Sequence, residues 1–160
     1  MYAFTYHPAT SVEEAAAQLQ KSPEANLLAG GMSLIPTMKL RLSSPGEIVD
    51  LNGLPELQGI TLADGTLTIG AMTRHAEVAA SADVRSAIPA LAELAGGIGD
   101  VQVRNRGTIG GSICFNDPAA DYPAGLVGLS ATVHTSERAI PADEFFVSLY
   151  ETALKSGEIV

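Results

Sequence analysis

The chain has 160 residues, of which 46% are hydrophobic and 17% are charged, a balance that excludes intrinsic disorder and predicts one domain with a buried core. Nine Lys and Arg residues against 18 Asp and Glu residues give a net charge of −9, which argues against binding to nucleic acid or to an anionic membrane. A single cysteine excludes an internal disulfide, and the lack of a long apolar run or a basic leader predicts a cytoplasmic protein without membrane insertion.

Short strands and helices alternate in the first third of the chain. Apolar spacing and helix caps predict, in chain order, a strand over residues 2–6, a helix over 12–21, a buried strand over 26–29, a helix over 32–42 and a strand over 47–51. Thr10 and Glu13 stand at the spacing of a capping box before the first helix. The second strand therefore runs directly into Gly30-Gly31 and the next helix.

The remainder of the chain mixes hairpins with helices. Its patterns predict, in order, a hairpin over 57–62 and 66–69 with an Asp64-Gly65 turn, helices over 73–80 and 88–95, a glycine turn over 108–112, a helix over 118–129, a hairpin over 131–135 and 138–140, and a closing helix over 143–150. Because hairpins and crossovers occur together, the elements indicate an α+β fold rather than a repeated βαβ unit.

The pair Gly30-Gly31 lies between a buried strand and the start of a helix. Glycines let successive backbone amides point at one centre, and a helix N-terminus adds positive partial charge, so this segment is a candidate site for a phosphate or a pyrophosphate. Ser33 offers a further hydroxyl donor. A plain tight turn is the simpler alternative, and the spacing matches neither the dinucleotide fingerprint Gly-x-Gly-x-x-Gly nor a P-loop.

A second segment, Thr108-Ile109-Gly110-Gly111-Ser112, repeats this arrangement of two glycines flanked by hydroxyl groups. Two such turns, each beside an apolar strand, can face one extended dinucleotide from both sides. On this hypothesis, a β-branched residue at Gly30 or Gly110 weakens cofactor retention more than it disturbs folding, because it fills a surface of close approach.

Longer stretches around both glycine pairs resemble the two flavin motifs of one family. Residues 28–42 are similar to the first motif, and residues 102–112 together with 117–123 are similar to the second. Residues 6–14 and 68–73 also resemble the family, so the likeness covers essentially all 160 residues. The family comprises the FAD-binding (medium) subunits of molybdenum hydroxylases, which include carbon monoxide dehydrogenase and xanthine dehydrogenase.

This resemblance implies a two-lobed α+β FAD-binding domain of the vanillyl-alcohol-oxidase (PCMH) type, with one lobe over about 1–52, the other over about 53–160, and FAD in the cleft between them. The first motif would wrap the pyrophosphate through backbone amides, and the second would approach from the other lobe. By position, the implied FAD-binding residues are Leu28, Ala29, Gly30, Gly31, Met32, Ser33, Leu34, Ile35, Ile98, Thr108, Ile109, Gly110, Gly111, Ser112 and Asp121.

The resemblance also implies a role in electron transfer. Electrons from a molybdenum centre on a large subunit would pass through a small 2Fe–2S subunit to FAD and then to an external acceptor, so those two subunits are the expected partners. This task needs no catalytic acid or nucleophile on the chain. A C-terminal domain that follows in the family has no counterpart in these 160 residues, which indicates a fragment or a split subunit.

Two alternatives stay open: a different flavin oxidoreductase on the same fold, and a non-catalytic remnant or assembly module of that fold. The three histidines lack metal-ligand spacing with Cys114, so we expect exposed or capping histidines, an inert buried thiol and no metal site. Arg104 and Arg106 are expected to pair with Asp100 and Asp117 rather than to form a docking patch for the iron–sulfur subunit.

Overall fold

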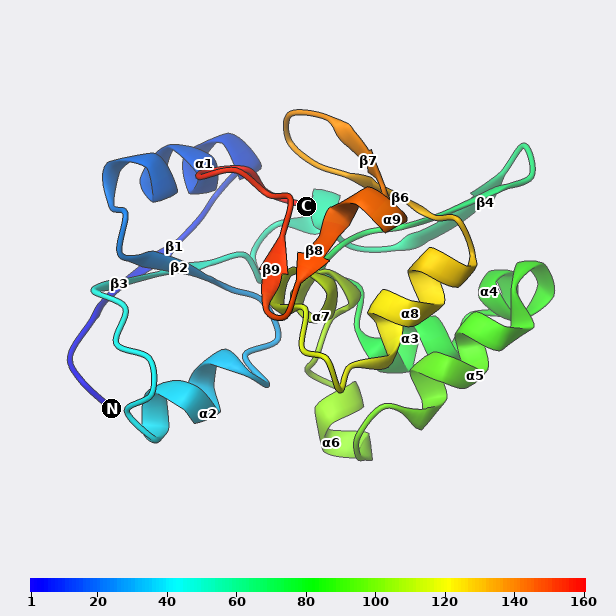
Figure 1. Ribbon diagram of the computed structural model, residues 1–160, viewed down its shortest axis with the longest axis horizontal. Helices are drawn as coiled ribbons and strands as arrows, with labels where there is room; N and C mark the ends of the chain where they lie inside the picture. Colours follow the sequence, from blue (N-terminus) through cyan, green and yellow to red (C-terminus); the bar gives the residue numbers. More distant parts are fainter.

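A small parallel sheet forms the first part of the structure, a computed structural model that describes residues 1–160 (Figure 1). Its strands lie in the order β1–β3–β2, and Ile48 and Val49 of the central strand are buried. Helix α1 packs on the sheet, and the short helix α2 follows β2. The bounds are β1 Thr5–Pro8, α1 Val12–Lys21, β2 Ala25–Leu28, α2 Leu34–Lys39 and β3 Glu47–Asp50.

Helix α1 has the predicted bounds but a different cap. Ser11, not Thr10, is the N-cap, and its hydroxyl accepts a hydrogen bond from the backbone amide of Glu14 at 3.1 Å. The carboxylate of Glu14, not that of Glu13, reaches back to the Thr10 amide at 2.7 Å. The hydroxyl cap is therefore shifted by one residue from the predicted one, because the extended N-cap conformation falls on Ser11, whereas the carboxylate still bonds to the predicted amide of Thr10.

Most of the helices belong to the second part of the structure, which lies to the right of the parallel sheet in Figure 1. Helices α3, α4 and α8 all contact α5, and α7 contacts α8. None of the helices has both the length and the apolar character needed to cross a membrane. The helices are the 3-10 turn η1 Pro55–Leu57, α3 His75–Ala80, α4 Ala82–Ala87, α5 Pro89–Gly97, α6 Val101–Arg104, α7 Ile109–Phe115, α8 Asp121–Gly128 and α9 Ala142–Phe145. The strands are β4 Ile60–Ala63, β5 Thr66–Ile69, β6 Thr132–His134, β7 Ala139–Pro141, β8 Phe146–Ser148 and β9 Glu151–Thr152.

The first hairpin, β4–β5, has the predicted turn. Asp64 and Gly65 both have positive φ, at 51° and 77°, which is the pattern that a type I′ turn requires. Strand β4 begins at Ile60 rather than at Leu57, because Leu57 belongs to the 3-10 turn before it. The predicted hairpin is therefore confirmed with a shorter first strand.

Two predictions in the second part are wrong. Residues 108–112 do not form a free turn, because Ile109–Phe115 is helix α7 with Thr108 as its N-cap. The closing helix predicted over 143–150 ends at Phe145, and the hairpin β8–β9 follows. In addition, α4 and α6 lie where no helix is expected from the sequence. In each case tertiary contacts outweigh the weak local propensities on which the predictions rest.

Two separate hydrophobic clusters, of 8 and 13 buried residues, fill the two parts of the molecule. The smaller cluster lies between α1 and the parallel sheet, and Met72 and Ile159 from later in the chain join it. We call the parts the first and the second lobe. We propose a boundary between about residues 52 and 53; Leu54, Met72 and Ile159 of the smaller cluster reach across it.

Candidate functional site

A cleft of about 680 Å³ lies between the two lobes, and both glycine segments line it. The segments touch each other: a Cβ atom on Gly30 would overlap the carbonyl oxygen of Arg106, and one on Gly111 would lie 3.5 Å from the Cβ of Ala29. The two glycine pairs therefore converge, as the hypothesis of a shared ligand requires. The cleft has the volume of an ordinary ligand pocket, for which the range is about 300–1,000 Å³.

The first glycine segment offers a row of unused backbone donors. A run of successive amides, which includes those of Gly30, Gly31, Met32 and Ser33, donates to no backbone acceptor. Gly31 has φ 73°, a left-handed conformation that favours glycine and turns the chain between β2 and α2. Because amides in folded proteins ordinarily have partners, free amides beside a cleft indicate a site for an anionic ligand.

The second glycine segment differs, because the protein already uses its amides. Gly110 donates to the carbonyl oxygen of Ala71 at 2.8 Å, and Gly111 donates to the hydroxyl of Thr108 at 3.1 Å. A Cβ on Gly110 would also lie 2.7 Å from the Ala71 oxygen. The second pair of glycines therefore permits close packing at the start of α7, and the free amides belong to the first segment.

Side-chain charge contributes little attraction for an anion here. No lysine or arginine lines the cleft, and Asp117 is the one carboxylate there. Helix α2 has six residues, and Ser33 gives it no side-chain cap. The dipole of this helix therefore adds less positive potential at the cleft than the sequence predicts. In a chain of net charge −9, the free amides are thus the main source of positive potential at this cleft.

Most of the residues implied by the resemblance line the cleft: Ala29, Gly30, Gly31, Met32, Ser33, Leu34, Ile98, Thr108, Gly110, Gly111 and Ser112. The others lie outside its lining. Leu28 and Ile35 pack beside the first glycine segment, with side-chain carbons 3.2 and 2.6 Å from a Cβ built on Gly31. Ile109 is buried in the core of the second lobe, and Asp121 is exposed at the start of α8. Contact of these residues with a cofactor stays a prediction.

Two polar residues that are not among the predicted site residues hold the first glycine segment in place. The side-chain amide of Asn52 donates to the carbonyl oxygen of Ala29 at 3.0 Å and to Asp50 at 2.6 Å. Burial raises the pKa of Asp50, but hydrogen bonds from Tyr6 and Asn52 outweigh it and keep that pKa below its usual value. The sequence signal is the pattern Asp-x-Asn at the end of a strand, since such side chains often bond to nearby backbone.

His75 also lines the cleft, which corrects its expected place as an exposed or capping histidine. It is 5% exposed at the start of α3, and its ring packs at a tilt against Tyr122 with centroids 5.4 Å apart. Neither its Nδ1 atom nor the Tyr122 hydroxyl has a hydrogen-bond partner within the protein. Burial lowers the pKa of His75 to about 4 and raises the pKa of Tyr122, so both side chains are neutral at pH 7.

We expect the protein to lose stability as the pH falls from about 6.5 toward 4, in part through His75. Its pKa drops from 6.5 to about 4 on folding, so over this range the unfolded chain binds the proton first. In His75→Phe, which keeps a ring against Tyr122, the loss between pH 7 and 4.5 should be smaller by about 2 kcal/mol. Urea unfolding of both proteins at the two pH values measures this difference, and equal losses would refute it.

The remaining predictions near the cleft have mixed outcomes. Cys114 lines the cleft, and burial raises the pKa of its thiol to about 12, which agrees with an inert cysteine. The predicted ion pairs of Arg104 and Arg106 are wrong, because neither has an acidic partner within 4.0 Å. Arg104 instead donates to the carbonyl oxygens of Ile98 and Gly99, at 2.9 and 3.0 Å. No group of three His, Cys, Asp or Glu side chains is arranged to hold a metal ion.

Residues 2–160 match the protein family described as the FAD binding domain in molybdopterin dehydrogenase. The chain is 44% identical over 162 residues to the carbon monoxide dehydrogenase medium chain of Hydrogenophaga pseudoflava, a match that covers 98% of this chain and 56% of that protein. It is 40% identical over 161 residues to the glyceraldehyde dehydrogenase medium chain of Sulfolobus acidocaldarius, with 98% and 57% covered.

The fold matches as closely as the sequence. A structure of carbon monoxide dehydrogenase from Hydrogenophaga pseudoflava, in a form that lacks the Mo-pyranopterin moiety of the molybdenum cofactor, superimposes with a TM-score of 0.96 at 44% identity. The match covers 99% of this chain and 57% of that chain. The expected α+β fold is confirmed, and the chain spans little more than half the length of the relatives that it matches.

Proposed function

Because this chain belongs to the family of FAD binding domains in molybdopterin dehydrogenases, we propose that its cleft holds the FAD of such an enzyme and that electrons pass through it. FAD is the cofactor of the family. Bound FAD supplies the redox chemistry, whereas the protein binds the cofactor, orients it and adjusts its potential. Electron transfer of this kind requires no acid, base or nucleophile from the chain.

The observation that carries the proposal is the run of free amides from Gly30 to Ser33 at a cleft without basic side chains. The diphosphate of FAD is an anion that needs several hydrogen-bond donors, and successive backbone amides supply them without lysine or arginine. From the second lobe, Thr108 and Ser112 offer hydroxyl groups at the cleft. The residues present therefore fit an extended, anionic dinucleotide.

Partners are a further part of this proposal. The named relatives are medium chains of dehydrogenases. We propose that this domain likewise works beside a large molybdenum-cofactor subunit and a small 2Fe–2S subunit, from which it takes electrons and passes them to an external acceptor. The cytoplasmic location expected from the sequence belongs to the same proposal.

Titration of the purified chain with FAD, followed by flavin fluorescence and absorbance, tests this function. We expect saturable binding of one FAD per chain, with reduction of the flavin by a reduced 2Fe–2S partner. A flavin that is reduced by a small substrate without any partner would instead favour a separate flavin oxidoreductase. A chain that takes up no FAD would contradict the proposal and favour the non-catalytic remnant.

A further inference from the structure

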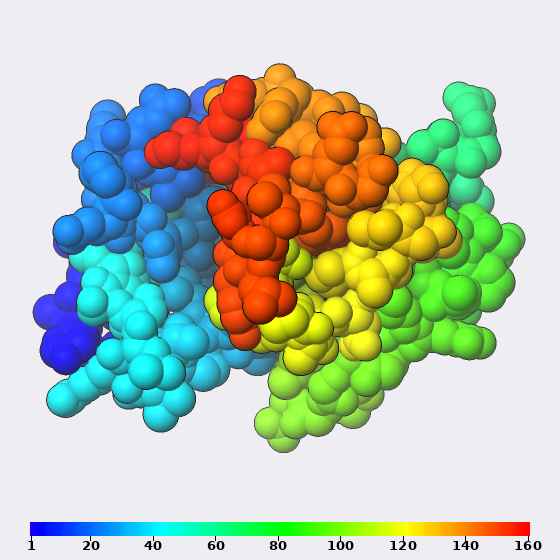
Figure 2. All heavy atoms as spheres, in the orientation of Figure 1, coloured from blue at the N-terminus to red at the C-terminus, as the bar shows by residue number.

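The last residues of the chain cross from the second lobe to the first. In Figure 2 they lie between the blue first lobe and the orange region of β6 and β7. Gly157 has φ 82°, and a Cβ at this position would lie 2.9 Å from the side chain of Gln20 on α1. We call residues 155–160 the C-terminal crossing, since they contact both lobes.

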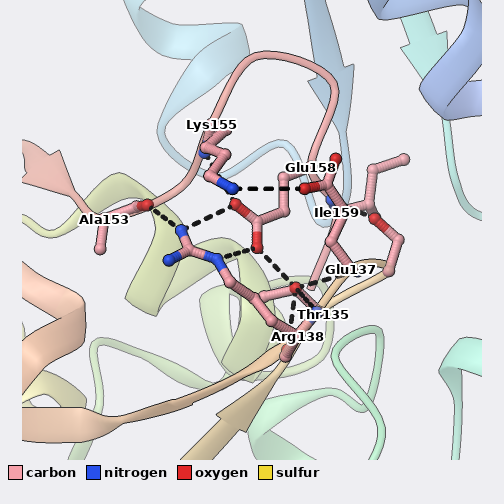
Figure 3. A network of polar contacts seen from close by, with 8 residues as sticks. Thr135, Glu137, Arg138, Ala153, Lys155, Glu158 and Ile159 are labelled. Atoms are coloured by element: carbon pink, nitrogen blue, oxygen red, sulfur yellow. Dashed lines mark hydrogen bonds and ion pairs between the residues drawn. The ribbon is translucent and has the colours of Figure 1, made fainter.

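Glu158 fixes the C-terminal crossing to the second lobe (Figure 3). Its side chain has no exposed area, and its carboxylate accepts two hydrogen bonds from the guanidinium group of Arg138, at 2.9 and 3.1 Å. The hydroxyl of Thr135 and the amide of Lys155 donate to it as well, at 2.6 and 2.8 Å. Arg138 also donates to the carbonyl oxygen of Ala153 at 2.6 Å. Every oxygen of this buried carboxylate therefore has donors, as a buried charge requires.

Backbone contacts continue the attachment one residue further. The amide of Ser136 donates to the carbonyl oxygen of Ile159 at 2.7 Å, and the amide of Ile159 donates to the Ser136 hydroxyl at 3.1 Å. Ser136 lies in the turn between β6 and β7, next to Thr135 and close to Arg138 in the chain. Glu158 and Ile159 are thus held by the same hairpin of the second lobe.

The two residues after Glu158 reach into both lobes. Ile159 is 2% exposed and belongs to the core cluster of the first lobe, whereas Val160 packs against the core cluster of the second. Both residues line the cleft together with the glycine segments. An ion pair on the second lobe therefore determines where an apolar side chain of the first-lobe core lies, at the wall of the cofactor cleft.

We propose that Arg138 and Glu158 form a positioning pair that locks the two lobes around the cleft and thereby sets its affinity for FAD. The inference rests on the proposed function, because FAD is the ligand by which it is measured. Neither residue lines the cleft, so the pair acts through Ile159 and Val160. Without the pair, FAD binding would include the entropic cost of ordering the C-terminal crossing.

The variant Glu158→Gln tests the pair, because it keeps the size of the side chain and removes its charge. We expect FAD to bind about tenfold more weakly, and we expect the Ile159 amide to exchange its hydrogen faster. Arg138→Lys retains the positive charge but loses the planar fork of donors, so it should fall between the two proteins in both measurements. Glu137→Gln is the matched control, since Glu137 is exposed and lies 3.7 Å from Lys155; it should change neither quantity.

The outcomes separate this inference from the proposed function. Weaker FAD binding and faster exchange in Glu158→Gln, with intermediate values of both in Arg138→Lys, would support the positioning pair. Faster exchange with unchanged FAD affinity would overturn it, and so would an equal loss of affinity in the control. A parent chain that binds no FAD would overturn the proposed function and, with it, the claim about affinity.

Discussion

Replacing Gly30 with alanine should lower the affinity for FAD at least about 100-fold and destabilise the protein by about 2–4 kcal/mol. The added Cβ would overlap the carbonyl oxygen of Arg106 and would come within 2.7 Å of the Gly107 Cα, and neither is the end of a flexible side chain. The two glycine segments would have to separate, which displaces the free amides from the cleft. FAD titration and urea unfolding measure the two effects.

Gly97→Ala is the matched control for this substitution. Gly97 is exposed at the end of α5, and a Cβ there meets nothing within 4 Å, so both FAD affinity and stability should stay close to those of the parent chain. The sequence predicts that a β-branched residue at Gly30 or Gly110 weakens cofactor retention more than it disturbs folding. Because a Cβ at either position would meet backbone atoms, we expect folding to be disturbed as well. Parent-like affinity in Gly30→Ala would show that the contact between the segments is unimportant.

Replacing Arg138 with methionine should destabilise the folded chain more than the loss of an exposed ion pair does. Methionine retains most of the apolar stem but leaves the fully buried carboxylate of Glu158 without its counter-charge. Because hydrogen bonds from Arg138 chiefly hold the pKa of Glu158 at about 2, well below its usual 4.5, this stabilisation is present above about pH 4.5 and fades as the pH falls toward 2. Urea unfolding at pH 7 and pH 3 gives both the magnitude and its dependence on pH.

Lys155→Met provides the comparison for the Arg138 variant. The ion pair of Lys155 with Glu137 is exposed and 3.7 Å long, so its loss should cost less than about 1 kcal/mol. Equal destabilisation by the two substitutions would show that burial of Glu158 does not strengthen its pairing. A loss in Arg138→Met that is the same at pH 3 and pH 7 would argue against the assigned carboxylate.

The sequence predicts correctly those helices and strands that have a distinct local pattern. Helix α1 and the hairpin β4–β5 were predicted well, because a cap with an apolar face and an Asp-Gly turn each require one backbone geometry. The start of α7 was missed, because Gly110-Gly111 has low helix propensity, and the contact of Gly110 with Ala71 that makes glycine necessary is distant in sequence. Only the folded chain reveals such a packing requirement.

The sequence predicts which segments line the candidate site, but not which residues hold those segments in place. Both glycine pairs line one cleft, yet the sequence could not show that the second pair has its amides occupied by Ala71 and Thr108. Asn52 follows the local pattern Asp-x-Asn. His75 and Glu158 were missed because each acts through a partner that is remote in the chain or through burial. Neither remoteness nor burial leaves a local pattern in a single sequence.

Amide resonances in heteronuclear NMR spectra of the chain, recorded during titration with FAD, test the central claim most directly. The account predicts large shifts and new protection from exchange at Gly30, Gly31, Met32 and Ser33, whose amides have no backbone acceptor before FAD is added. The amides of Gly110 and Gly111 should already be protected and should change little. Saturation with FAD that leaves residues 30–33 unshifted, while amides on another face respond, would contradict the account.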